Sequence, residues 1–136
     1  MRAPIYPDPF ADEGEQRFTY ALMPHQGGWA DGGVRQEADD LNQPLLSLQA
    51  TGLAAGVQTP LALSGHPVGL SALKPAEDSR GLILRVYEPA GGRGDVAVVP
   101  PAGWTLTGTV DLLEEPLSTD PIVRPFEVRS WRLAPA

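Results

Sequence analysis

The chain of 136 residues contains no cysteine, which excludes disulfide bonds, thiolate catalysis and cysteine-ligated metals. Cations are also scarce, with 10 Lys plus Arg against 17 Asp plus Glu and a formal net charge of −7. Proteins that bind nucleic acids need clustered lysine and arginine, so we expect no nucleic-acid partner. No run of apolar residues approaches the ~18 needed to span a bilayer, so we also expect no contact with a membrane.

The same absences bear on the cellular compartment. A lack of cysteine fits a reducing compartment, but it also fits a stable extracellular domain. The first residues show no long apolar run of the kind found in signal peptides. On these two observations we expect a cytoplasmic protein.

Catalytic and metal-binding patterns are scarce. The two histidines, His25 and His66, are far apart in the sequence and have no carboxylate at ligand spacing, so neither predicts a metal site. Ser64 precedes Gly65 and His66, but the Gly-x-Ser-x-Gly pattern of a serine nucleophile is missing because residue 62 is alanine.

Two pairs of adjacent carboxylates are the remaining candidates for acid–base chemistry, because glycoside hydrolysis requires two carboxyl groups. They are Asp39-Asp40 and Glu114-Glu115. Neighbouring side chains normally point in different directions, so we expect both pairs to be solvated rather than catalytic.

Glycine and proline, in contrast, are abundant, with 15 of each. Both residues interrupt helices, which makes a helical bundle very unfavourable. Only residues 34–41 show helical spacing of apolar side chains, with Val34, Ala38 and Leu41 on one side. Alternating or β-branched runs predict strands at 17–22, 45–51, 61–64, 68–73, 81–88, 95–99, 105–112 and 125–133. The prediction is an all-β fold, an antiparallel β-sandwich with one short helix, formed by a single domain of residues 1–136.

Two interaction hypotheses follow from the residues alone. Trp29, Trp104 and Trp131 could stack on sugar rings, which would make the chain a carbohydrate-binding β-sandwich module without catalysis. Residues 90–95 form a glycine-rich turn containing Arg-Gly-Asp, a tripeptide that serves as an adhesion signal in some extracellular proteins. Three residues carry little information, so adhesion ranks below sugar binding.

Several collinear segments, spanning nearly the whole chain, resemble the C-terminal β-domain of bacterial alpha-mannosidases of glycoside hydrolase family 38. The most specific run is Leu-Lys-Pro-Ala-Glu-Asp at 73–78 with Gly-Leu-Ile-Leu-Arg-Val-Tyr-Glu at 81–88. The other matching segments are 2–9, 11–22, 24–25, 37–45 with its Leu-Asn-x-Pro-Leu pattern, 111–114 and 125–129.

The resemblance implies more than the residues do. Members of the family are zinc-dependent retaining enzymes that hydrolyse terminal alpha-linked mannose from glycans. Their zinc ligands and nucleophile lie in an N-terminal catalytic domain whose motifs match no position here, so no catalytic or metal residue is assigned. The resemblance therefore implies a C-terminal piece of a larger multidomain glycosidase, either expressed as a fragment or encoded by a split gene. Such a structural and docking domain would be inactive alone and would have the catalytic domain as its partner.

The resemblance also implies one sugar contact. The segment that resembles residues 2–14 faces the catalytic domain in the family, where an arginine can reach the sugar site. Arg2 occupies that place, and a guanidinium makes forked hydrogen bonds to vicinal oxygens. Asp12 is the second substrate-binding candidate. A domain separated from its partner exposes apolar surface, so we also expect weak self-association.

Overall fold

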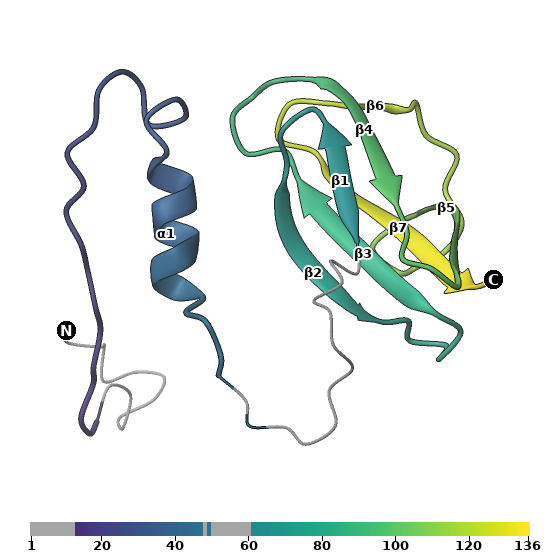
Figure 1. Cartoon of the computed structure of the whole chain (residues 1–136), viewed down its shortest axis with the longest axis horizontal. Coiled ribbons are helices and arrows are strands. Elements are labelled where there is room, and N and C mark those ends of the chain that lie inside the picture. Colours follow the sequence, from purple (N-terminus) through teal and green to yellow (C-terminus); the bar gives the residue numbers. More distant parts are fainter. Residues whose placement is uncertain (1–12, 48, 50–60) are drawn as a thin grey trace. The chain divides into compact units, whose positions relative to one another are not determined.

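The computed structural model describes residues 13–47, 49 and 61–136 (Figure 1). The chain divides into two compact units, Met1–Leu48 and Gln49–Ala136. Among the described residues, the first unit contains the helix and the second contains the strands.

The helix α1 spans Val34–Asn42, which confirms the prediction from apolar spacing. Arg35 donates a hydrogen bond of 2.7 Å to Asp39 one turn later, an arrangement that stabilises exposed helices. The backbone N–H of Gln43 donates to the Asp39 carbonyl at 2.8 Å and closes the last turn. No residue of α1 is buried, and no helix of the described residues is long and apolar enough to cross a membrane.

Two predicted strands are missing from the described residues. Residues 17–22 alternate as a strand should, but the structure shows no strand there, so that prediction is wrong for the chain by itself. A strand needs a partner for its backbone groups, and the described strands pair only with one another. Residues 45–47 and 49 are also outside any strand, and the rest of the 45–51 prediction falls outside the described residues.

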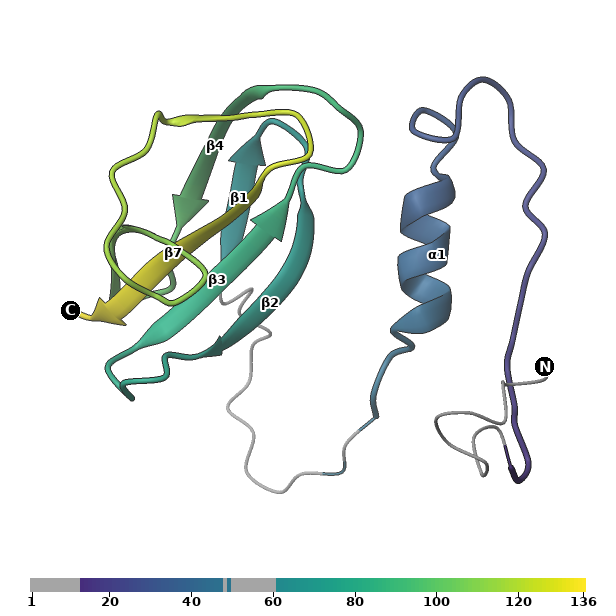
Figure 2. The same ribbon diagram turned by 180° about the vertical axis from the view of Figure 1, so that it is seen from behind.

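The second unit consists of antiparallel strands in two sheets. The strands are β1 (Ala62–Gly65), β2 (Gly69–Pro75), β3 (Leu82–Tyr87), β4 (Gly94–Val99), β5 (Trp104–Val110), β6 (Ile122–Val123) and β7 (Val128–Pro135). One sheet has the order β1-β4-β6 and the other has the order β2-β3-β7-β5. Figure 2 shows β3 and β7 side by side at the centre of the larger sheet. The all-β sandwich with one short helix is therefore confirmed.

The main core lies between the two sheets. Leu84 and Trp131 are cross-strand neighbours on β3 and β7, and both are buried. The other buried members are Val86 and Leu133; the smaller sheet and the flanking strands cover them with Leu61, Leu63, Val68, Leu82, Val96, Val98 and Trp104. Burial of each large aliphatic side chain contributes about 1.5–3 kcal/mol, so this core stabilises the packing of the two sheets.

A smaller apolar cluster lies on the opposite face of the larger sheet. Ile83 alternates with Leu84 along β3 and so points away from the main core, yet it is fully buried against Ala76 and Val110. An outer face normally meets solvent, so the segments after β2 and β5 must cover this one. These covering segments also carry polar residues.

Two glycines fit places where the backbones come close. Gly65 has a φ of 94°, and a Cβ on it would lie 2.3 Å from the Asp95 carbonyl oxygen. Gly81 has a φ of 113°, and a Cβ would lie 2.1 Å from the Leu133 carbonyl oxygen. The turns at these strand ends therefore require glycine.

Candidate functional site

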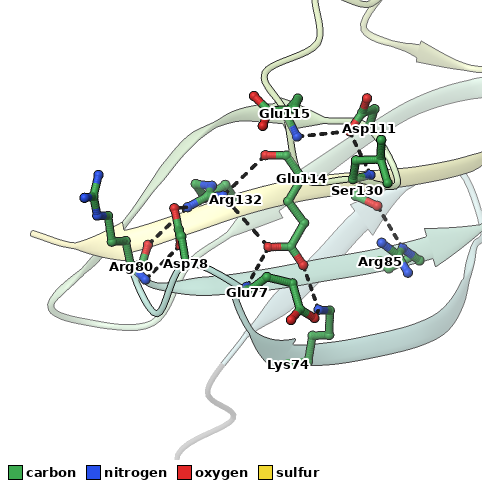
Figure 3. A network of polar contacts seen from close by, with 11 residues as sticks. Lys74, Glu77, Asp78, Arg80, Arg85, Asp111, Glu114, Glu115, Ser130 and Arg132 are labelled. Carbon is green, nitrogen blue, oxygen red and sulfur yellow. Dashed lines mark hydrogen bonds and ion pairs between the residues drawn. The ribbon is translucent and has the colours of Figure 1, made fainter.

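Two clusters of polar contacts in the sandwich are each centred on a buried carboxylate. The Glu114 cluster covers the outer face of the larger sheet and consists of Lys74, Glu77, Asp78, Glu114 and Arg132 (Figure 3). The Glu88 cluster lies among the loops after β1, β3 and β6 and consists of His66, Glu88, Ala90, Gly91 and Phe126.

Strand register builds the Glu114 cluster. Lys74, Ile83 and Arg132 are aligned across β2, β3 and β7, so the two cations flank the buried isoleucine on the same face. The turn that connects β2 and β3 supplies Glu77 and Asp78 beside them. The segment after β5 supplies Glu114, whose side chain is 5% exposed.

The Glu114 carboxylate is the centre of this cluster. It accepts from the Lys74 ammonium at 2.6 Å and from the backbone N–H of Glu77 at 2.8 Å. Arg132 donates to the Glu114 carbonyl oxygen at 3.3 Å and to the Asp78 carboxylate at 2.8 Å. The Lys74 ammonium also contacts the Glu77 carboxylate at 2.6 Å. Two cations thus hold three carboxylates on one face.

This arrangement favours the ionised forms of Glu114 and Asp78. The hydrogen bond from Lys74 and then the one from the Glu77 N–H lower the pKa of Glu114. The hydrogen bond to Glu114 in turn raises the pKa of Lys74. The Arg80 N–H and then the Arg132 guanidinium lower the pKa of Asp78. A glycosidase acid needs a raised pKa, so Glu114 and Asp78 are suited to holding structure rather than to donating a proton.

The cluster fixes an unusual turn. Glu114 has a φ of 68°, and the Asp111 carboxylate accepts from the N–H groups of Leu113 at 2.8 Å and Glu115 at 3.0 Å. The same turn leaves Leu112 66% and Leu113 81% exposed. The buried carboxylate therefore anchors a segment that presents two leucines to its surroundings.

The Glu88 cluster joins three loops through one buried carboxylate. Glu88 is 2% exposed. Its Oε1 accepts from the Ala90 N–H at 3.1 Å and lies 3.3 Å from His66 Nε2. Its Oε2 accepts from the N–H of Gly91 at 2.7 Å and of Phe126 at 3.1 Å. Phe126 has a φ of 58°, a conformation that this contact helps to hold.

Main-chain N–H donors lower the pKa of Glu88 by more than burial raises it. Burial alone would raise the pKa of this carboxyl group, but hydrogen bonds from the Phe126, Ala90, Gly91 and Gly92 N–H groups lower it to about 2. The carboxylate is therefore ionised at neutral pH. Every contact given above is a loop anchor, and none leaves an oxygen free for a substrate.

A buried arginine connects β6 to β7. Arg129 is 5% exposed, and its guanidinium donates to Glu127 Oε1 and to the carbonyl oxygens of Pro121 and Ile122, each at 2.7–2.9 Å. Four such bonds satisfy most of its donors. Arg129 therefore acts as a structural clamp.

The structure separates the two pairs of adjacent carboxylates as expected. Asp39 pairs with Arg35 while Asp40 is exposed, and Glu114 is buried while Glu115 is exposed. The expectation that both pairs are solvated is wrong for Glu114. Its burial depends on Lys74, far away in the sequence, so no local pattern could have indicated it.

The histidines, Ser64 and the Arg-Gly-Asp sequence were the other candidates in the sequence. His25 lies in the first unit and His66 in the second, and the described residues contain no group of three or more His, Asp or Glu that could hold a metal ion. A zinc site therefore does not fit the described part of this chain. Ser64 belongs to β1, and residues 94–95 of the Arg-Gly-Asp sequence begin β4.

The tryptophans and the two substrate-binding candidates remain to be placed. Trp131 is buried in the main core and Trp104 packs against it, whereas Trp29 is 52% exposed. Arg2 and Asp12 lie outside the residues that the structure describes, so their contact with sugar stays a prediction. Neither Glu88 nor Arg129 was singled out from the sequence, because their partners are set by the tertiary fold.

Comparison with known proteins places this geometry in a family. Residues 67–131 match the glycosyl hydrolases family 38 C-terminal beta sandwich domain. Alpha-mannosidase 2C1 from Homo sapiens is 46% identical over 99 residues, which cover 70% of this chain and 10% of the human protein. Alpha-mannosidase 2C1 from Mus musculus is 43% identical with the same coverage. Alpha-mannosidase G from Dictyostelium discoideum is 31% identical over 96 residues, covering 68% of this chain and 9% of that protein.

The chain thus spans about a tenth of the length of the curated relatives it matches. No solved structure matches it. The matched residues run from the loop before β2 to the middle of β7, and so contain most of the main core and most of both polar clusters. Leu133, Arg132 and His66 lie just outside the match. The chain belongs to glycosyl hydrolase family 38, of which it carries the C-terminal β-sandwich domain.

Proposed function

We propose that the chain is the C-terminal structural and docking domain of a zinc-dependent retaining alpha-mannosidase that hydrolyses terminal alpha-linked mannose from glycans. The observation that carries the proposal is the match of residues 67–131 to the C-terminal domain of family 38. The relatives that share this region are named alpha-mannosidases, and nine-tenths of their length lies outside it.

The chemistry of the described residues favours a structural role over a catalytic one. The two buried carboxylates, Glu88 and Glu114, have lowered pKa values and are occupied by structural hydrogen bonds. In this proposal, zinc and the catalytic groups belong to an N-terminal catalytic domain, which is the partner of this chain. In this proposal, Arg2 and Asp12 bind the substrate. Residues 1–136 form one domain, and the enzyme is cytoplasmic.

The alternative, a carbohydrate-binding module, has less support. A sugar platform needs exposed aromatic faces, but Trp131 and Trp104 contribute to the core. Trp29 is the exposed tryptophan of the described residues. Calorimetric titration of the chain with mannose oligosaccharides separates the two proposals, because binding at millimolar ligand would favour the module.

Two assays test the leading proposal. The isolated chain should not hydrolyse p-nitrophenyl alpha-mannoside, with or without added zinc, and zinc-dependent turnover would overturn its assignment as a non-catalytic domain. A chimera in which the chain replaces the matching region of human alpha-mannosidase 2C1 should hydrolyse that substrate. A chimera without activity would count against the docking role.

A further inference from the structure

The first unit has an unusual apolar surface on its extended segment. Phe18, Tyr20 and Leu22 alternate with Arg17 and other smaller or polar residues. Their exposed fractions are 75%, 86% and 94%. Three large side chains at alternate positions form the apolar face of a β-strand, which globular proteins normally bury.

This segment has the pattern of a strand but no strand partner in the described part of the chain. Both described sheets are made of residues from 62 onward. An extended backbone with unpaired N–H and C=O groups is a template for pairing with another strand. Residues 17–22 therefore lack only the edge of a sheet with which to pair.

The helix side of the same unit is also uncovered. No residue of α1 is buried. A groove of about 650 Å³ separates residues 21–25 from α1, and its lining includes Leu22, Val34 and Leu41. The first unit thus exposes apolar surface on both of its described parts, and none of its described residues is buried.

Charge and length indicate what covers this surface. Residues 13–47 carry six carboxylates and two arginines, a charge of −4, and residues 61–136 carry nine carboxylates against seven cations. A second copy of the chain would therefore bring like charge to the surface. The relatives, in contrast, contain about nine-tenths of their length outside the matched region, which is ample to supply a sheet.

We propose that residues 17–22 form a β-strand that pairs with an open sheet edge in the rest of the alpha-mannosidase, burying Phe18, Tyr20 and Leu22. This inference rests on the proposed function. Strand addition of this kind obtains affinity from main-chain hydrogen bonds and specificity from alternate side chains. The 17–22 strand is then the connection through which the sandwich is fixed to its enzyme.

Trypsin cleavage after Arg17 tests the proposal, because the Arg17 side chain is 85% exposed and strand pairing would protect the bond to Phe18. Cleavage is followed by mass spectrometry in the isolated chain and in the chimera with human alpha-mannosidase 2C1. We expect rapid cleavage in the isolated chain and cleavage about tenfold slower or more in the chimera. The triple variant F18S/Y20S/L22S should restore rapid cleavage in the chimera, whereas the control Thr19→Ser, on the opposite face, should remain protected.

The outcomes separate this inference from the proposed function. An inactive chimera would count against the proposed function. An active chimera cleaved after Arg17 as fast as the isolated chain would overturn the strand, and so would equal protection of the triple variant. Protection of the isolated chain that increases with its concentration would identify a second copy as the occupant, and concentration-independent protection would identify the chain's own sandwich. Either result would overturn the proposal.

Discussion

Replacement of Glu88 by glutamine tests how the sandwich holds its loops together. The side chain keeps its size, but one accepting oxygen becomes an NH₂ group. If that group takes the place of Oε2, the N–H groups of Gly91 and Phe126 both lose their acceptor and face a donor. If it takes the place of Oε1, the Ala90 N–H loses its acceptor instead. In either orientation the remaining bonds lose the charge of the carboxylate.

The magnitude follows from these contacts. Hydrogen bonds to a charged group contribute about 1.5–3 kcal/mol each, and Glu88→Gln removes one or two of them. We expect the free energy of unfolding to fall by about 3 kcal/mol and the melting midpoint by roughly 10 °C. Glu115→Gln is the matched control, because Glu115 is exposed, and it should leave the midpoint nearly unchanged.

The pH dependence gives a second, independent measurement. The pKa of Glu88 is lowered from 4.5 to about 2 on folding, so its stabilisation is fully present above pH 4.5 and is lost as the pH falls toward 2. Thermal unfolding followed by circular dichroism between pH 7 and pH 2 should therefore show the wild type and Glu88→Gln converging in acid. Equal midpoints at pH 7, or a difference that stays constant down to pH 2, would refute the assignment of Glu88 as a charged anchor.

Three further predictions use the same unfolding measurement. Leu84→Ala should cost about 2–5 kcal/mol because it leaves a cavity in the core, whereas Leu70→Ala, at a side chain that is 57% exposed, should cost far less; equal losses would contradict the position of the core. Gly81→Ala should destabilise the protein more than Gly103→Ala, since both glycines have positive φ but only Gly81 has a carbonyl oxygen where a Cβ would lie, and the reverse order would refute the close approach. Lys74→Met should lower the midpoint at neutral pH. Because folding raises the pKa of Lys74 above 10.5, the difference from wild type should shrink as the pH rises through the pKa of the folded state. A difference that persists in strong alkali would argue against the ion pair with Glu114.

Local sequence patterns predicted most of the secondary structure. The apolar spacing of α1 and the β-branched and aromatic composition of β3 each depend on residues within one short segment, so they could be recognised without tertiary information. β6 was missed because two residues, Ile122–Val123, are too short to show a period. Residues 17–22 show the opposite error, since their alternation is clear but pairing needs a second strand.

Local sequence patterns could not predict the polar clusters. Glu88 binds the Phe126 N–H and Glu114 binds the Glu77 N–H, and each pair is separated by more than thirty residues in the sequence. The sequence placed Glu88 only at the end of a predicted strand and Glu114 only beside another carboxylate. What each carboxylate contacts became visible only with the register of β2, β3 and β7.

The distribution of the tryptophans gives each unit its own optical label. Trp131 is 6% exposed and Trp29 is 52% exposed, so their indole rings occupy an apolar and an aqueous environment, respectively. Buried indoles emit at shorter wavelength than hydrated ones, which makes the blue edge of the fluorescence spectrum a reporter of the sandwich and the red edge a reporter of the first unit. A single spectrum, recorded before and after a partner is added, can therefore tell which of the two units has changed its surroundings.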